Sequence, residues 1–305
     1  MPPLTRKLLA ALRTAGHWSL AQLVFGLFGL LRALGPDRAA DLVGFLARSV
    51  GPLLPVSRTG LANLRHAYPD LSEAEHRRIL AGCWDNLGRT AAEYANLDRL
   101  WDLDPDNLGA GRIEVVGAEE FIRLRDSGRP SIIFTAHLAN WELLPIAAAT
   151  HGLSVAALYR PPNNRYIARK ILEVRAGSMG GLIPTGNIAS LAMAAVLERG
   201  EHLGLLVDQH FTRGIAVPFF GRPAMTNPAL ARLARRFDCP VHGARVMRLP
   251  GRRFRVELTP EIPLPRDERG AVDVVGTMAR VTEIVEGWVR EHPEQWLWLH
   301  RRWRV

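Results

Sequence analysis

Cysteine is nearly absent from this sequence of 305 residues, which contains only Cys83 and Cys239. Neither belongs to a Cys-x-x-Cys pair, so we expect neither a disulfide framework nor a thiolate zinc site, and a reducing compartment fits best. The ten histidines form neither a His-x3-His nor a His-Glu-x2-His pattern. The sequence therefore predicts no bound metal, and it gives no sign of a cofactor.

Lysine is equally scarce, because Lys7 and Lys170 are the only two, and the formal net charge of +9 comes almost entirely from arginine. The planar guanidinium binds phosphates through a fork of donors, so an arginine-rich surface suits anionic lipid headgroups, phosphosugars or nucleic acid. Codon usage in a GC-rich genome, together with ordinary solubility, explains the same excess equally well. The arginines are spread along the chain and match no nucleic-acid-binding module, so nucleic acid is not an expected partner.

One long apolar run covers residues 18–34 and is interrupted only by Gln22 and Arg32. As a helix it would reach about 25 Å, which is less than the roughly 30 Å of a hydrocarbon core. The residues ahead of it, 1–17, contain basic side chains and no acidic one. The run is thus the candidate for a signal peptide, a spanning helix or an interfacial anchor.

These three interpretations make different demands on the sequence. A cleaved signal peptide needs small residues at a processing site, but the run ends in Gly35-Pro36-Asp37-Arg38. A spanning helix behind basic residues would place the rest of the chain outside the cytoplasm. An anchor that lies in the bilayer surface, or dips into it, keeps both ends on one side. We favour the anchor and assign residues 1–36 to it.

The remainder of the chain predicts an α/β fold. Residues 37–100 repeat apolar side chains at helical spacing, and Ser72 followed by acidic residues signals a helix N-terminus. Expected strands cover residues 113–116, 131–135, 154–159, 202–207, 215–219, 241–247 and 254–259. Expected helices lie near 140–150, 163–178, 187–199, 226–237 and 272–291. This alternation predicts a mixed central sheet covered by helices, and without an evident linker residues 37–305 form one domain.

The strongest local signal is the segment 131–142, in which a buried strand ends at His137 and a helix begins soon afterwards. In a continuous helix, residues five apart point about 140° away from each other. His137 and Glu142 therefore meet only if the histidine lies in the strand-to-helix turn and the glutamate in the first helical turn. Asn140 is a suitable N-cap for this arrangement, whereas Pro145 just inside the helix would kink it.

A carboxylate bonded to one imidazole nitrogen fixes the tautomer and leaves the other nitrogen free as a base. The ends of strands are also where open α/β sheets build their sites. From spacing alone, however, a turn histidine beside an unrelated surface glutamate is the more frequent explanation. The dyad interpretation of His137 and Glu142 thus depends on its wider context.

A covalent nucleophile is not expected. The segment 176–180, Ala-Gly-Ser-Met-Gly, comes close to a Gly-x-Ser-x-Gly elbow, but it lacks the first glycine and follows a helix instead of a strand. Ser178 is therefore not predicted to form an acyl-enzyme.

Context for the histidine comes from five motifs in register. The His-x4-Glu spacing at 137–142 resembles the His-x4-Asp/Glu motif of glycerolipid-type acyltransferases. The others are Tyr159-Arg160-Pro161, Asp208-Gln209, Val217-Pro218-Phe219-Phe220-Gly221 with Thr226, and Pro293-Glu294-Gln295-Trp296-Leu297-Trp298-Leu299-His300-Arg301-Arg302-Trp303. The last resembles a P-E-Q-aromatic-x-W-x-H-R-R-aromatic signature over its full length. With the apolar N-terminus, nearly the whole chain is similar to the late acyltransferases of bacterial lipid A biosynthesis, of lauroyl and myristoyl type.

The resemblance implies a glycerolipid acyltransferase-like fold and an O-acyltransferase without a cofactor. His137, oriented by Glu142, would take a proton from the hydroxyl of a hydroxyacyl chain on a lipid A precursor. That oxygen would attack an acyl thioester carried by acyl carrier protein. Because this carrier is cytoplasmic, the resemblance places the enzyme on the cytoplasmic face of the bacterial inner membrane.

The resemblance also suggests substrate-binding residues. Arg160 would contact an acceptor phosphate or the reacting ester, unless it is a strand-end arginine in a salt bridge. Asp208 would position an acceptor hydroxyl or bind Arg160, with Gln209 beside it, although an aspartate after a strand is often a turn residue or helix cap.

The closing motif has two interpretations that both hold in part. Arg301 and Arg302 among tryptophans suit a phosphosugar headgroup or a membrane interface. Alternatively, Trp298 and Leu299 belong to the core and His300 is a hydrogen-bonded partner.

Two other functions remain open. A related branch acylates mannosylated phosphatidylinositol with the same chemistry and a similar order of motifs. A basic protein that binds a membrane surface or nucleic acid without catalysis is the alternative from another class, and it would lack activity on acyl carrier protein thioesters.

Overall fold

The computed structural model describes residues 3–104, 106–107, 111–176, 180–186 and 188–303. The N-terminal third is helical, as expected, and consists of α1 (Pro3–Leu34), α2 (Pro36–Val50), η1 (Gly51–Leu53), α3 (Ser57–Ala67), α4 (Glu73–Glu93) and η2 (Tyr94–Arg99). The predicted start signal of α4 is confirmed, because Ser72 and Glu75 form a complete capping box.

A mixed sheet of seven strands forms the centre of the body, with the order β1-β9-β8-β2-β5-β3-β4. Its strands are β1 (Ile113–Val116), β2 (Ile132–Thr135), β3 (Val155–Tyr159), β4 (Leu182–Pro184), β5 (His202–Leu206), β8 (Val241–Leu249) and β9 (Arg253–Leu258). All neighbours are parallel except β8 and β9. A separate antiparallel hairpin joins β6 (Ile215–Phe219) and β7 (Arg222–Thr226).

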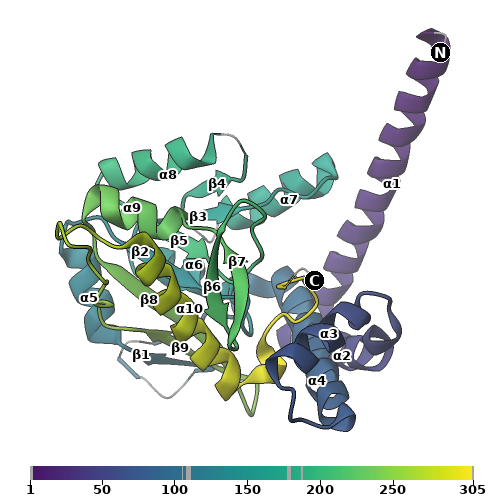
Figure 1. Ribbon diagram of the computed structural model, residues 1–305. Coiled ribbons are helices and arrows are strands. Elements are labelled where there is room, and N and C mark those ends of the chain that lie inside the picture. Colours follow the sequence, from purple (N-terminus) through teal and green to yellow (C-terminus); the bar gives the residue numbers. More distant parts are fainter. Residues whose placement is uncertain (1–2, 105, 108–110, 177–179, 187, 304–305) are drawn as a thin grey trace.

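Helices cover both faces of the sheet (Figure 1). They are α5 (Ala118–Asp126), α6 (Leu143–Thr150), α7 (Arg165–Ala176), α8 (Ala189–Glu198), α9 (Ala229–Phe237) and α10 (Val274–Glu291), followed by η3 (Pro293–Gln295). Side chains of α3, α4, α8, α9 and α10 share one core cluster with β2 and β5, while α5 and α6 contribute to clusters that also contain β1, β3 and β9. The predicted α/β class with a helix-covered mixed sheet is confirmed.

Three elements were not expected from the sequence: α5, β4 and β7. The β7 residues Arg222–Thr226 end where we expected a helix to begin, so that helix, α9, starts only at Ala229. Pro145 does not break α6, because the helix starts at Leu143 and the proline falls in the first turn, where its missing N–H has no helical partner. The division of the chain after residue 36 remains a prediction.

Helix α1 projects away from the body in Figure 1. Its apolar stretch Leu12–Leu34 has 23 residues, and little of it is buried. At 1.5 Å per residue this stretch is about 35 Å long, so the expectation that it is too short for a span, which counted from Trp18, is wrong. By its length and composition, this one helix of the described residues can cross a membrane. N-terminal signal sequences can have a similar length and composition.

Candidate active site

Two parallel strands bring His137 and Asp208 together at the carboxyl edge of the sheet. Thr135 of β2 is opposite Leu206 of β5, and the ladder continues with a hydrogen bond of 3.0 Å from the Val207 N–H to the Thr135 carbonyl. His137 and Asp208 each lie two residues beyond their strand, so the register places them side by side. This edge is where open α/β sheets hold their ligands.

Asp208 is fully buried, and both of its carboxylate oxygens form hydrogen bonds with His137. Its Oδ1 lies 2.8 Å from the His137 Nδ1, and its Oδ2 accepts the His137 backbone N–H at 2.9 Å. The buried indole N–H of Trp296 donates to the same Oδ2 at 2.8 Å. Burial alone would raise the pKa of the Asp208 carboxyl, but the His137 imidazole and backbone N–H hold it well below its usual range. The ionised carboxylate keeps the proton of the neutral imidazole on Nδ1 and leaves Nε2 as the free base.

The loop that carries His137 is fastened by a segment far away in the sequence. The Ala139 N–H donates to the Gln295 carbonyl at 3.0 Å, and the Leu297 N–H donates to the His137 carbonyl at 3.1 Å. Ala139 has a φ of 46°, a left-handed conformation that costs on the order of 1 kcal/mol for a residue with a Cβ. These contacts hold the strained turn, and with it the direction of the imidazole.

Glu142 does not make the predicted contact with His137. It stands just before α6, where the Asn140 side chain accepts its backbone N–H at 3.3 Å, and its buried carboxylate accepts a hydrogen bond from the Arg175 Nη2 at 2.5 Å. Because the turn directs Glu142 towards α7, Asp208 takes the place on Nδ1 that we expected the glutamate to fill. Burial raises the pKa of the Glu142 carboxyl, and the Arg175 charge opposes this shift.

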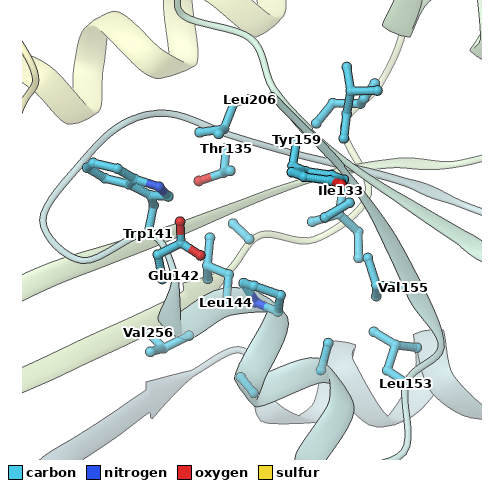
Figure 2. Close-up of a pocket in the computed structure, with 18 of the residues that line it drawn as sticks. Ile133, Thr135, Trp141, Glu142, Leu144, Leu153, Val155, Tyr159, Leu206 and Val256 are labelled. Carbon is cyan, nitrogen blue, oxygen red and sulfur yellow. The ribbon is translucent and has the colours of Figure 1, made fainter. Parts of the chain in front are cut away.

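An elongated apolar cavity of about 370 Å³ begins at these residues. His137, Glu142 and Arg175 belong to its lining, and the rest is mostly aliphatic. In Figure 2, Glu142 and Thr135 lie towards one end of the lining and Leu153 lies towards the other. The cavity therefore joins a polar end to a hydrocarbon-like end, as a fatty acyl chain requires.

The other predicted binding residues are divided between the cavity and the core. Arg160 follows β3, is exposed and lines the cavity. Gln209 is exposed, and its Nε2 lies 3.4 Å from the His137 Nε2. Asp208, which we expected to meet an acceptor hydroxyl or Arg160, instead holds the imidazole from behind.

Arg302 is buried in the core, and Arg301 is exposed. The Arg302 guanidinium donates to the Met225 carbonyl at 3.0 Å and to the Thr226 hydroxyl at 2.8 Å, and it stacks over the Phe219 ring. Burial lowers the pKa of Arg302 to about 10. These contacts fasten the closing motif to the β6–β7 hairpin, so in this structure Arg302 faces protein groups and not the cavity.

The described residues offer no activated cysteine. Burial raises the pKa of the Cys83 thiol to about 12 and that of Cys239 to about 11, so both are neutral at physiological pH. Ser178 lies outside the described residues. Within the described part of the chain, no group of three or more His, Cys, Asp or Glu side chains could hold a metal ion.

Sequence reasoning missed two residues of the site. Arg175 is the ion-pair partner of Glu142 and lies in α7, and Trp296 donates to Asp208 from the closing motif. Trp296 lies in the P-E-Q-aromatic motif. This motif marked the residue as part of the resemblance, but it did not predict the hydrogen bond to Asp208. No local pattern pointed to Arg175, because its partner is distant in the chain.

The geometry fits general base catalysis on a hydroxyl. Asp208 can stabilise the imidazolium that forms when Nε2 accepts a proton, and the apolar cavity beside it can hold the acyl chain.

Comparisons with known proteins show which sequences this chain resembles. A family model described as bacterial lipid A biosynthesis acyltransferase matches residues 5–305. The lipid A biosynthesis palmitoleoyltransferase of Escherichia coli (strain K12) is 28% identical over 252 residues, which cover 80% of this chain and 77% of that protein. The lauroyltransferase of the same strain is 26% identical over 250 residues, with the same shares covered. Its myristoyltransferase is 27% identical over 276 residues, which cover 88% of this chain and 81% of the relative.

Proposed function

Because the chain belongs to the bacterial lipid A biosynthesis acyltransferase family, we propose that it transfers a fatty acyl chain from acyl carrier protein to a hydroxyl of a hydroxyacyl chain on a lipid A precursor. The observation that carries this proposal is a histidine, held by a buried carboxylate, at the polar end of an apolar cavity.

His137 is the proposed general base. Its Nε2 removes the proton of the acceptor hydroxyl as the oxygen attacks the thioester carbonyl, and the thiol of the carrier then leaves with a proton. Asp208 stays ionised and stabilises the imidazolium between these events. Gln209, 3.4 Å from Nε2, lies where it can orient the acceptor oxygen.

Glu142 is proposed as the second catalytic carboxylate. Its negative charge interacts with His137 across the site, which favours the imidazolium form. It also holds Arg175 in the cavity wall, where a cation can stabilise the negative charge that develops on the thioester oxygen. Arg160 at the same cavity and exposed Arg301 are proposed contacts for acceptor phosphates.

We also propose that the protein is held at the cytoplasmic face of the inner membrane by α1. Large apolar side chains are exposed along this helix, among them Leu23, which is 73% exposed, and Leu30, which is 59% exposed. Nearby Phe45 of α2 and Leu53 of η1 are 65% and 81% exposed. A bilayer would bury this surface, and the donor, acyl carrier protein, is cytoplasmic.

Deletion of residues 1–34 tests the anchor. The shortened protein should leave the membrane fraction and lose more activity on a bilayer-embedded acceptor than on a detergent-dispersed one. A periplasmic location of a reporter fused at Val305 would contradict the proposed side.

The function itself is tested with purified protein, acyl carrier protein thioesters and a tetra-acylated lipid A precursor. Mass spectrometry should detect an acceptor that gains one acyl chain, with a matching release of carrier thiol. Mannosylated phosphatidylinositol serves as the competing acceptor. Acylation of that lipid but not of the lipid A precursor would overturn the proposal, as would thioester hydrolysis without transfer to either acceptor.

A further inference from the structure

A second apolar hollow lies outside the active-site cavity, between α1 and the body. It has a volume of about 460 Å³. We call it the lateral groove; its lining includes Phe25, Phe28, Gly29, Tyr94, Lys170 and Val174. These residues come from α1, η2 and α7, so the groove runs along the flank of the exposed apolar helix.

Helix α1 is hydrogen-bonded to the body at two places along its length, and it also packs on the body between them, where Ala21 is fully buried and the Phe28 ring contacts the Tyr94 ring. The Asn164 side chain donates to the His17 carbonyl at 2.8 Å, and Arg32 donates two hydrogen bonds of 2.7 Å to Asp98. Between these contacts the helix is about 22 Å long. The groove therefore opens beside a surface that, in our proposal, lies in the bilayer.

Only one layer of side chains separates the lateral groove from the active-site cavity. Tyr94 lines the groove, whereas Arg175 and Glu142 line the cavity. The Arg175 Nε donates to the Tyr94 hydroxyl at 3.0 Å, and its Nη2 donates to Glu142 at 2.5 Å. A chain in the groove thus lies against the wall of the catalytic site.

The charge beside the groove suits a phosphorylated lipid. Helix α7 carries four basic side chains and one acidic one, and Lys170 belongs to the groove itself. Arg169 is 84% exposed at the side chain, and Arg160 is exposed at the active-site cavity close by in sequence. These basic side chains would bind a lipid with phosphate monoesters more strongly than an uncharged or zwitterionic lipid.

We propose that the lateral groove binds one hydrocarbon chain of the acceptor, an acylated phosphoglycolipid, while α7 contacts its phosphates. The inference rests on the proposed function and adds the place where the acceptor enters from the bilayer. In this arrangement the two hollows hold different chains: the cavity takes the acyl group of the thioester, and the groove takes a chain that the acceptor already carries.

Photo-crosslinking tests occupancy without catalysis. We would place p-benzoylphenylalanine at Phe28, which lines the groove, or at its neighbour Leu27, which is 52% exposed and outside the groove. The full chain is irradiated in vesicles of phosphatidylethanolamine and phosphatidylglycerol that contain a few per cent of tetra-acylated lipid A precursor. Adducts at position 28 should be enriched in the precursor at least fivefold over those at position 27. The proposal would be overturned if the lipids crosslinked at positions 27 and 28 had the same composition, or if no lipid was crosslinked at position 28.

Filling the groove tests its role in turnover. An added Cβ at Gly29 or at Gly26 meets no atom within 4 Å, but only Gly29 belongs to the groove. Gly29→Trp should raise the KM for the precursor about tenfold and leave the KM for the acyl thioester unchanged, while Gly26→Trp should leave both near the parent values. An unchanged acceptor KM in Gly29→Trp would contradict the inference. A parent protein without any transfer would instead count against the proposed function, and the crosslinking result would stand by itself.

Discussion

Asp208 and Glu142 are both buried carboxylates beside the same imidazole, yet their surroundings differ. Asp208 lies behind the site, accepts three N–H groups and has a pKa well below its usual range. Glu142 lies at the front, has Arg175 as its cation partner and has a raised pKa. The carboxylate that is nearest to His137 in the sequence is therefore not the one that holds it. Strand register, which joins positions 71 residues apart, decides the pairing.

Of the substitutions considered, the largest loss of activity is expected at His137. His137→Ala should lower kcat by about 10⁴-fold, because it removes the proposed general base. Transfer from acyl carrier protein to the lipid A precursor measures this loss. His151→Ala, at a histidine that bonds Trp101 and is outside the cavity lining, is the control and should keep near-normal turnover. A similar loss in both variants would mean that damage to the fold explains the result.

Asp208→Asn should lower kcat by about 10³-fold, since an amide cannot accept all three N–H groups and no longer fixes the tautomer. The depressed pKa adds a test by stability: the ionised Asp208 stabilises the fold above its unfolded pKa of about 3.9, and this contribution is lost as the pH falls. The difference in Tm between parent and variant should therefore shrink below about pH 4. A variant that turned over normally would show that the observed pairing is not the functional one.

Glu142→Gln should lower kcat by about 10²-fold, because it removes a charge that favours the imidazolium and that holds Arg175. The distinction between the two carboxylates requires that Asp208→Asn lose more activity than Glu142→Gln. If Glu142→Gln lost as much as His137→Ala while Asp208→Asn stayed active, the dyad predicted from the sequence would be restored.

Trp296→Phe should have a smaller effect, about a tenfold loss of kcat, because Asp208 keeps its two bonds to His137. The KM values should not change, since the indole lies behind the carboxylate and outside the cavity lining. A rise in KM instead of a fall in kcat would contradict a positioning role for this tryptophan.

The smallest effect is expected at the cysteines. With pKa values of about 12 and about 11, the thiols of Cys83 and Cys239 should resist iodoacetamide at pH 8 in the folded protein. Activity should survive the treatment, and intact-protein mass spectrometry during turnover should detect no covalent acyl adduct. Rapid alkylation with loss of activity would reopen the question of a nucleophile.

Most strands could be predicted because they contain short runs of apolar side chains, as in Ile113–Val116 and Ile132–Thr135. The bounds of β1 and β6 agree with the prediction residue for residue. The strands that were missed lack this signal: β4 has three residues, and β7 contains Pro223 and runs into Thr226, which looked like the beginning of a helix. Local sequence patterns therefore predicted the strands that contain an apolar run. They did not predict β4 and β7, which form only by pairing with a neighbouring strand.

Sequence reasoning selected His137 and Asp208 as candidates, but it predicted neither their pairing nor the part played by Arg175 and Trp296. His137 and Asp208 each follow a strand, and both were selected from the sequence. Their contact depends on β2 and β5 being neighbours, which the chain order does not reveal because β3 and β4 lie between them in sequence. Arg302 was wrongly expected to face the substrate, because its partners, the Thr226 hydroxyl and the Met225 carbonyl, lie on β7, the strand of the hairpin that was not predicted.

The bonds from Gln295 and Leu297 to the loop of His137 also bear on how the protein matures. During synthesis the loop leaves the ribosome more than 150 residues before the segment that fastens it. Contacts of such large sequence separation form late and slowly, because a long loop must close first. A nascent chain that has completed its first strands therefore still lacks an oriented imidazole. We therefore expect the protein to become competent for transfer late in folding, after the residues that line the apolar cavity have packed.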